Sequence, residues 1–188
     1  MNIARFDISG PLLLTPKAHA DARGIFVETW VRERFDAAVG QAVEFVQDNQ
    51  SVSHAPGTVR GLHYQAPPRA QGKLVRCVRG AVVDIAVDAR RGSPTYGQNV
   101  RARLDGVEGE QLWVPEGFLH GFCTLEPDTV VAYKTTDTYA PEQDGAVRFD
   151  DPDLALDWGV EPAHVSDKDR AAPRFADWVS PFAYGDAP

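Results

Sequence analysis

The chain has 188 residues, of which 43% are hydrophobic, and this is enough for one domain with a substantial core. Its formal net charge of −8 argues against a nucleic-acid-binding protein, because contact with a polyphosphate backbone needs a broad cationic face. No stretch approaches the roughly 18 apolar residues of a membrane span, and residues 1–9 lack the apolar core of a signal peptide. We therefore expect a cytoplasmic protein that contacts no membrane.

The predicted secondary structure consists mostly of short strands. A helix is expected first, over residues 31–39, with Phe35 and Val39 on one stripe and Gly40 as its stop, and a second short helix within 161–172. Strands separated by Gly, Pro, Asp or Asn are expected between them, at 43–52, 59–65, 74–78, 82–88, 100–104, 111–114, 118–125 and 129–135. This spacing predicts an all-β fold, an antiparallel jelly-roll barrel that forms a single domain over residues 1–188.

Two details of the strand patterns bear on the interior of the barrel. Residues 82–88 alternate between apolar and acidic side chains, which predicts a half-buried strand with Asp84 and Asp88 on its polar face. Cys77 and Cys123 stand singly inside apolar patterns, which is typical of buried thiols rather than of a disulfide or a metal site.

A histidine and a lysine, His63 and Lys73, flank a Pro-rich turn between two of the predicted strands. Imidazole is the side chain that titrates nearest neutrality, and a fixed ammonium can stabilise a negative charge that develops during a reaction. The pair therefore suits proton abstraction next to a carbonyl group. The solvent-exposed face of any strand could carry the same two residues. The pair therefore indicates an active site only if other segments supply matching chemistry.

Other segments do supply it. Residues 115–120 read Pro-Glu-Gly-Phe-Leu-His, the P-x-G-x-x-H pattern that in cupin barrels joins two strands and points a histidine inward; a Pro/Gly hairpin capped by a histidine is the alternative. Residues 130–134 read Val-Val-Ala-Tyr-Lys, and residues 166–169 read Ser-Asp-Lys-Asp. With these motifs, and from the run at 21–28 onward, the chain resembles the dTDP-4-dehydrorhamnose 3,5-epimerase family.

The resemblance implies a cupin-type barrel and a homodimer in which N-terminal strands cross to the neighbouring subunit. Near the other end of the chain, residues 173–188 carry the aromatic side chains Phe175, Trp178, Phe182 and Tyr184. Such a cluster packs either on its own barrel or on a partner subunit. We expect this tail and the N-terminal strands to lie at a dimer interface.

The resemblance also implies a reaction. The family's substrate is dTDP-4-dehydro-6-deoxyglucose, whose C4 ketone acidifies the C–H bonds at C3 and C5, so epimerisation there needs no redox cofactor and none is expected. By resemblance, His63 is the base that removes the proton, Tyr133 is the acid on the opposite face of the ring, and Lys73 supports the enolate oxygen. Outside the resemblance, Tyr133 reads as a half-buried strand aromatic. The product would be dTDP-4-dehydro-L-rhamnose, on the route to dTDP-L-rhamnose.

A carboxylate at the second nitrogen of His63 would fix the tautomer of the base and stabilise the imidazolium formed in the step. Asp169 matches the family's partner for this histidine. Asp84, on the polar face of its predicted strand, remains open as a rival.

The resemblance further implies how the nucleotide is held. Binding of the diphosphate and thymidine orients the sugar ring, and arginine suits phosphate because its planar group donates two parallel hydrogen bonds. The family's pattern also places aromatic rings and a carboxylate around thymine. The implied binding residues are Arg23, Phe26, Glu28, Gln47, Asn49, Arg60, His120, Tyr139, Asp144 and Lys168. Asp144 stands where the family usually has glutamate, so its shorter reach leaves that contact open.

A metal site of the kind common in cupins needs an H-x-H pair, a carboxylate shortly after it and a later histidine. Position 65 is Gln65, and no carboxylate follows before Lys73, so no metal is expected. The remaining histidines lie in polar loop patterns and do not complete the ligand set: His19, His54 and His164.

Three alternative functions stay open. The first is a 3- or 5-monoepimerase of another dTDP-deoxysugar pathway, because residues that shape the sugar end cannot be compared within one sequence. The second is a non-catalytic nucleotide-sugar-binding cupin, which would have no need for His63, Lys73 and Tyr133 together. The third is a metal cupin dioxygenase or isomerase, which lacks its ligands here.

Overall fold

The computed structural model describes residues 1–185. They contain thirteen strands and three short helices. The strands are β1 (Asn2–Arg5), β2 (Leu12–Thr15), β3 (Ala18–Asp21), β4 (Gly24–Val27), β5 (Gln47–Ser53), β6 (Val59–Gln65), β7 (Lys73–Arg79), β8 (Ala81–Asp88), β9 (Asn99–Asp105), β10 (Gln111–Val114), β11 (Phe118–Thr124), β12 (Thr129–Thr135) and β13 (Asp144–Ala146). The helices are α1 (Arg32–Val39), α2 (Asp167–Arg170) and the 3-10 helix η1 (Phe175–Asp177). Within these residues, no helix is long and apolar enough to cross a membrane.

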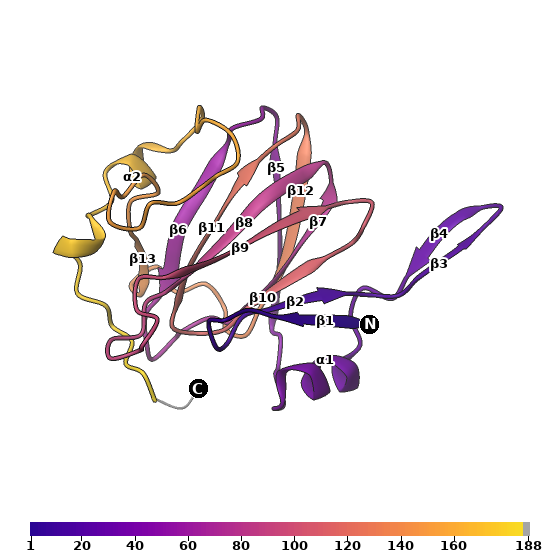
Figure 1. Ribbon diagram of the computed structural model, residues 1–188, viewed down its shortest axis with the longest axis horizontal. Coiled ribbons are helices and arrows are strands. Elements are labelled where there is room, and N and C mark those ends of the chain that lie inside the picture. Colours follow the sequence, from indigo (N-terminus) through magenta and orange to yellow (C-terminus); the bar gives the residue numbers. More distant parts are fainter. Residues whose placement is uncertain (186–188) are drawn as a thin grey trace.

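Two antiparallel sheets form the barrel (Figure 1). The first sheet has the strand order β1-β2-β10-β7-β12-β5, and the second has the order β13-β6-β11-β8-β9. The hairpin β3–β4, called the arm below, forms a separate two-stranded sheet and extends away from the barrel (Figure 1). The predicted all-β jelly-roll barrel is thereby confirmed.

The main core fills the space between the two sheets. Side chains alternate along a strand, so every second residue of β7, β8, β11 and β12 points inward. Val75, Val82, Phe118, Phe122 and Val131 belong to this buried cluster. Both cysteines are free and buried, as predicted, and burial raises the pKa of each thiol to about 11.

Two further clusters cover the outer faces of the sheets. Helix α1 follows the predicted stripe and packs Phe35 against the first sheet, and Gly40 ends it in the left-handed conformation at φ 89°. On the second sheet, Trp178 and Phe182 pack against Tyr64, with ring centroids 5.1 and 5.9 Å apart.

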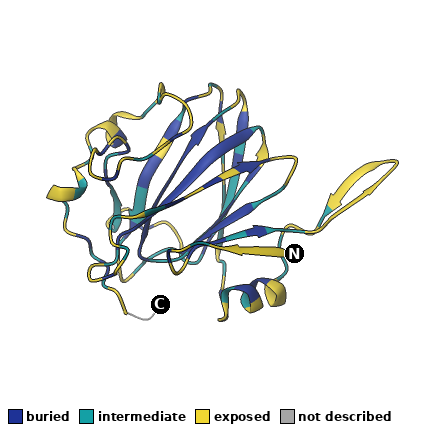
Figure 2. Cartoon of the chain, viewed as in Figure 1, coloured by how far each residue is buried: buried dark blue, intermediate teal, exposed yellow. Residues whose placement is uncertain are grey.

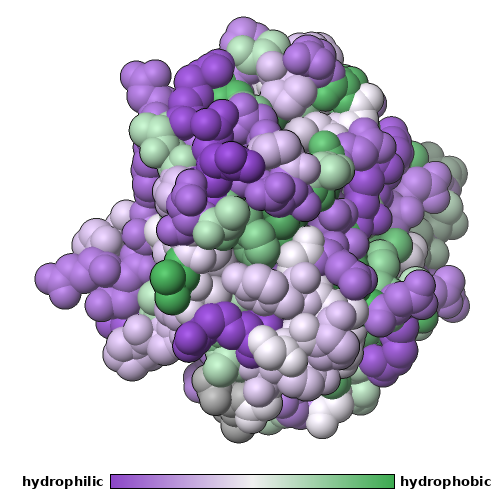
Figure 3. Space-filling view, turned by 60° about the vertical axis from the view of Figure 1, so that its left-hand side comes forward, coloured by the Kyte–Doolittle hydropathy of each residue, from purple (hydrophilic) through white to green (hydrophobic). Residues whose placement is uncertain are grey.

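The aromatic tail follows one of the two packing alternatives given for it. Phe175, Trp178 and Phe182 pack on their own barrel rather than reaching outward, which is the first of the two alternatives for this segment. Only Tyr184 among the four aromatic side chains of the tail is exposed, and residues 186–188 of the tail lie outside the described part of the chain. The surface over α2 and this segment is mostly hydrophilic, with small scattered hydrophobic patches (Figure 3).

Strand β8 corrects an expectation, because it is buried on both faces (Figure 2). Asp84 and Asp88 do not face solvent as predicted; they point into the barrel and are fully buried. A buried carboxylate needs partners, and each has them: His120 for Asp84, and Arg90, Ser93 and Thr95 for Asp88. The acidic positions of the alternating pattern in β8 therefore correspond to buried polar sites inside the barrel, not to a solvent-exposed face.

Element boundaries agree with the prediction in most strands. Strands β6, β10 and β12 have the predicted bounds, whereas β5 begins at Gln47 instead of residue 43. The prediction missed the short strands β1 to β4 and β13. The arm residues are almost all exposed (Figure 2), so they carry no alternating apolar pattern that could have revealed them.

Two glycines allow β6 and β11 to approach closely beside the barrel interior. Gly61 has a φ of 143°, and a Cβ atom there would lie 2.5 Å from the Cα atom of Gly121. A Cβ atom on Gly121 would lie 3.0 Å from the carbonyl oxygen of Arg60. The close contact brings the two strands together next to His63 and His120, which are direct register partners.

Candidate active site

A cavity of about 710 Å³ opens into the barrel, and all four predicted catalytic residues line it. Its position follows from strand alternation, because Val75, Phe122 and Val131 of the main core lie two residues from Lys73, His120 and Tyr133 on the same strands. Seven of the predicted site residues line it: Arg60, His63, Lys73, His120, Tyr133, Lys168 and Asp169.

His63 and Asp169 form a hydrogen-bonded pair inside this cavity. The Nε2 atom of His63 lies 2.7 Å from Oδ1 of Asp169, which is nearly buried. Asp169 sits in the first turn of α2, where its backbone N–H donates to the Ser166 hydroxyl that caps the helix. Burial alone would raise the pKa of Asp169, but the hydrogen bonds from His63 and Ser166 outweigh it and lower that pKa.

Lys73 and Tyr133 have pKa values shifted by the barrel interior. Burial lowers the pKa of Lys73 from 10.5 to about 8, against the opposing effect of the carboxylates of Asp144 and Asp84. Burial also raises the pKa of Tyr133, although Arg60 opposes the rise. At neutral pH the phenol of Tyr133 is therefore protonated and can serve as a proton donor. The ammonium of Lys73, which lines the same cavity, gives up its proton more readily than an exposed lysine.

The geometry shows which of the two candidate carboxylates, Asp169 or Asp84, binds His63. Asp84 binds His120 instead of His63, with its Oδ1 atom 2.6 Å from Nε2 of His120. The other oxygen of Asp84 is buried and finds no hydrogen-bond partner among the described residues. The barrel thus contains two separate histidine–carboxylate pairs, and the second was not predicted as a pair.

Several predicted binding residues surround the cavity mouth. Lys168 contacts the carboxylate of Asp144, which raises the pKa of Lys168, and the Tyr139 hydroxyl lies 3.5 Å from the same carboxylate. Asp144 thus has two neighbours despite its short side chain. Arg60 reaches Ser53 through its Nε atom at 3.3 Å and stays exposed on one side.

Gln47 and Asn49 lie beside this group on β5. The side-chain amide of Gln47 donates to Asn49 at 2.8 Å and accepts the backbone N–H of Tyr139 at 3.0 Å. Asn49 is the register partner of Tyr133 across the two paired strands. The two amides therefore share one face of β5, as their spacing predicts, and Asn49 lies beside Tyr133 of the cavity lining.

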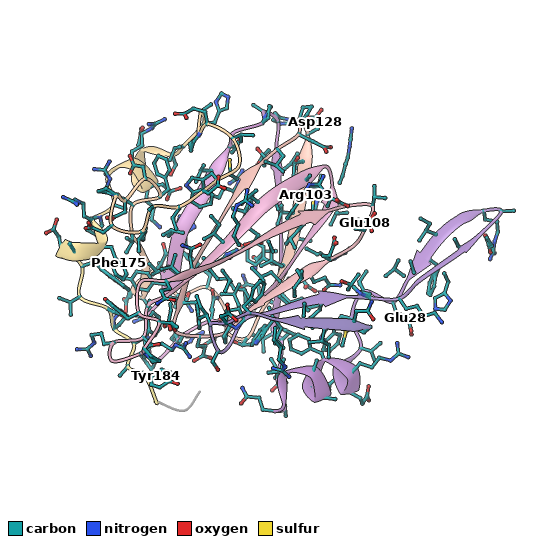
Figure 4. All side chains as sticks on the ribbon, viewed as in Figure 1. Glu28, Arg103, Glu108, Asp128, Phe175 and Tyr184 are labelled. Atoms are coloured by element: carbon teal, nitrogen blue, oxygen red, sulfur yellow. The ribbon has the colours of Figure 1, made fainter. Side chains whose placement is uncertain are left out.

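Three predicted binding residues lie far from the cavity in the described chain. Arg23 and Phe26 belong to the arm and its tip, where Arg23 pairs with the neighbouring Asp21 and Phe26 is 66% exposed. Glu28 follows the arm and forms an ion pair with Arg34 at 2.9 Å. It lies on the opposite side of the molecule from Phe175 and Tyr184 (Figure 4). A single subunit does not bring these three residues to His63.

Residues outside the prediction also line the cavity. His164, read from the sequence as a surface histidine, is exposed but borders the cavity, as do Ser166 and Arg170. Helix α2 lies within the predicted helical region 161–172, and the Ser-x-x-Asp spacing of Ser166 and Asp169 is a helix-start signal that could have drawn attention to Ser166. His164 gives no such signal, because only the pairing of its loop with Thr58 brings it there.

The residues at the possible metal positions have other partners. Gln65, where metal cupins have a second histidine, accepts the backbone N–H of Ala140 at 2.8 Å and donates to the carbonyl of Thr138 at 3.1 Å. It therefore anchors the loop that carries Tyr139. Within residues 1–185, no group of three His, Cys, Asp or Glu side chains is arranged to hold a metal ion.

Comparison with known proteins gives a consistent picture. The family model described as dTDP-4-dehydrorhamnose 3,5-epimerase matches residues 5–177. A protein of that name from Shigella flexneri is 45% identical over 177 residues, which cover 94% of this chain and 97% of the relative. A dTDP-4-dehydrorhamnose 3-epimerase from Streptomyces niveus is 40% identical over 172 residues, covering 92% and 83% of the two chains.

Solved structures agree with the sequence relatives. The crystal structure of dTDP-6-deoxy-D-glucose-3,5-epimerase from Legionella pneumophila, in complex with dTDP-4-keto-L-rhamnose, superimposes with a TM-score of 0.88. That protein is 44% identical in sequence, and the match covers 92% of each chain.

Proposed function

Because the chain belongs to the dTDP-4-dehydrorhamnose 3,5-epimerase family, we propose that it converts dTDP-4-dehydro-6-deoxy-D-glucose to dTDP-4-dehydro-L-rhamnose by inverting C3 and C5. This is a step of dTDP-L-rhamnose biosynthesis, and we place it in the cytoplasm with other nucleotide-sugar chemistry. The observation that carries the proposal is the pairing of His63 with Asp169 in a cavity that also contains Lys73 and Tyr133.

His63 is the proposed base. Its Nε2 atom is hydrogen-bonded to Asp169, so the Nδ1 atom is available to the substrate as an acceptor when the ring is neutral. When Nδ1 takes a proton from C3 or C5, the carboxylate of Asp169 stabilises the imidazolium that forms. The electron pair of the C–H bond moves into an enolate whose charge lies on the C4 oxygen.

Lys73 and Tyr133 complete the step. The ammonium of Lys73, which lines the cavity, stabilises the enolate oxygen. Tyr133 returns a proton from the opposite face of the ring, and burial favours its protonated form by raising its pKa. Removal on one face and return on the other invert the carbon, and the reaction consumes no cofactor. The His120 side chain would bind the sugar close to the C4 oxygen.

The nucleotide would be held by residues at the cavity mouth. Arg60 and Lys168 supply positive charge for the diphosphate, and the amides of Gln47 and Asn49 supply hydrogen bonds. Tyr139, whose ring is exposed, would stack on thymine. Asp144 would orient Lys168 through their direct contact.

A homodimer would add the residues that one subunit lacks at its own cavity. The arm reaches away from its barrel and exposes Ile25 (63%) and Phe26 (66%), more apolar surface than an isolated hairpin tolerates well. Val52 and Val78 are also exposed on the outer face of the first sheet. Packing these surfaces against a second copy would bring Arg23, Phe26 and Glu28 to the partner's cavity. The interface is then self-complementary, as expected for a two-fold dimer.

The experiment that tests this function follows hydrogen exchange by NMR. The enzyme is incubated in D₂O with dTDP-4-dehydro-6-deoxy-D-glucose, in the presence and absence of EDTA. We expect deuterium at both C3 and C5 and formation of the L-rhamno product, at the same rate with the chelator. A chelator-sensitive reaction would favour the metal cupin, and no label at either carbon would favour a binding protein.

The second candidate function is a monoepimerase, because the Streptomyces niveus relative is named a 3-epimerase. It would use the same base and enolate but complete inversion at a single carbon. Deuterium at C3 alone, in the experiment above, would establish this function and overturn inversion at C5.

A further inference from the structure

The second histidine–carboxylate pair, Asp84 with His120, lies inside the barrel next to the first. His120 is the register partner of His63 on neighbouring strands, so the two imidazoles enter the cavity side by side. Asp84 is fully buried, and the His120 side chain is almost as deeply buried. This pair is thus farther from solvent than His63 and Asp169, although both histidines line the same cavity.

The hydrogen bond to Asp84 decides what His120 can offer a substrate. Its Nε2 atom faces Asp84 at 2.6 Å, which leaves Nδ1 for the sugar. A neutral ring with its proton on Nε2 can only accept at Nδ1, whereas an imidazolium donates from both nitrogens. Donation to a ketone or enolate oxygen therefore requires the charged ring, and a carboxylate at Nε2 is the group that stabilises it.

The free oxygen of Asp84 points to a second task. It is buried and without a hydrogen-bond partner among residues 1–185, a costly arrangement unless a nearby cation balances the charge. Lys73 is such a cation, and Asp84 is one of the two carboxylates that raise its pKa against the effect of burial. The groups around Lys73 come from five strands: Asp84 (β8), Asp144 (β13), His63 (β6), His120 (β11) and Tyr133 (β12).

We propose that Asp84 is a positioning residue for the reaction proposed above. Its carboxylate orients His120 through the hydrogen bond at Nε2, so that Nδ1 faces the C4 oxygen, and its negative charge lies among the groups around the Lys73 ammonium. Asp84 therefore acts through two other side chains and does not touch the sugar. The inference rests on the proposed function for its chemistry, but the two interactions of Asp84 exist in the enzyme without substrate.

The variant Asp84→Asn removes the charge while keeping the size of the side chain. We expect kcat to fall by about 100-fold, the usual effect of losing one donor to a developing oxyanion. We also expect the loss of kcat at alkaline pH, which follows deprotonation of Lys73 near pH 8, to move to lower pH. The matched control is Asp88→Asn, because Asp88 lies on the same strand and face, is equally buried, and binds Arg90 and Ser93 outside the cavity.

A second measurement uses the enzyme without substrate and so separates this inference from the proposed function. The titration of Lys73 is followed by ¹³C NMR, and the ring nitrogens of His120 by ¹⁵N NMR, with Lys73→Met and His120→Asn for assignment. In Asp84→Asn we expect Lys73 to lose its proton at lower pH and the Nε2–H signal of His120 to shift, because its acceptor changes from a carboxylate to an amide oxygen, with neither change in Asp88→Asn. These results would stand even if the wild type exchanged no deuterium.

Opposite results would overturn the inference. An Asp84→Asn enzyme whose alkaline loss of kcat and Lys73 titration coincide with those of Asp88→Asn would reduce Asp84 to a structural residue. If Asp84→Asn does not fold, the wild-type spectrum decides, because a His120 ring that carries its proton on Nδ1 alone cannot be held as proposed.

Discussion

Among single residues, Lys73 carries its charge in surroundings that oppose it. Burial lowers its pKa to about 8, so it stays mostly protonated at neutral pH but not far above it. In an unfolded chain the same lysine would hold its proton up to about pH 10. The folded protein therefore gives up stability to keep an ammonium where an enolate oxygen is proposed to form.

Replacing Lys73 with methionine should separate stability from activity. We expect Lys73→Met to abolish epimerisation yet raise the free energy of unfolding at pH 7, by no more than about 3 kcal/mol, because a buried charge is removed. The gain should shrink between about pH 8 and 10.5, where folded wild type already holds Lys73 neutral while the unfolded chain still protonates it. Urea denaturation at pH 7 and at pH 10 measures both values. A variant less stable than wild type at pH 7 would contradict this account.

Asp169 is the residue on which the proposed base depends most. We expect Asp169→Asn to lower kcat by about 100-fold or more with a smaller change in KM, because the amide can no longer stabilise the imidazolium of His63. Asp167→Asn is the matched control, since Asp167 lies in the same turn of α2 but is exposed. Steady-state kinetics of the two variants give the comparison, and equal activities would remove Asp169 from the mechanism.

Among the structural elements, the arm stands apart, because its two strands pair only with each other in a sheet separate from the barrel. It contacts solvent along nearly its whole length, yet it carries Arg23 and Phe26, which we propose bind the nucleotide. A subunit exchange experiment can decide whether these residues serve the partner. Arg23→Ala and His63→Ala are each expected to be nearly inactive alone.

Mixing the two variants should restore activity if the arm crosses to the partner. After the subunits exchange at equal concentrations, half the dimers contain one barrel with His63 and an intact arm from the other subunit. We expect about one quarter of wild-type activity, because each mixed dimer has one complete site. Activity that stays at the level of the separate variants would show that each arm serves its own barrel or no barrel.

The sequence predicted the elements whose side chains pack into the core. It did not predict the exposed strands of the arm, whose side chains have no such contacts. Strands β6, β10 and β12 bury much of their length and are bounded by turn residues, so their bounds followed from the sequence pattern. Strand β8 broke the rule because its acidic residues point into the barrel, where His120 and Arg90 bind them. Those partners are distant in sequence or depend on loop geometry, and no local pattern encodes such contacts.

On the scale of the whole molecule, a protein with a net charge of −8 concentrates cations around one cavity. The motifs predicted which residues gather there, and seven of them line it. They did not predict that His63 and His120 would each have a carboxylate of their own. Pairing across 106 and 36 residues depends on how the barrel closes, which only the fold determines.

The central claim is that the imidazole of His63 removes the protons next to the ketone. The most direct test is deuterium incorporation into the keto sugar in D₂O, compared between His63→Ala and Tyr133→Phe at equal enzyme concentration. We predict that His63→Ala incorporates no deuterium at C3 or C5, whereas Tyr133→Phe still exchanges protons but forms no inverted product. Exchange by His63→Ala at the wild-type rate would contradict the claim and assign the base to another residue.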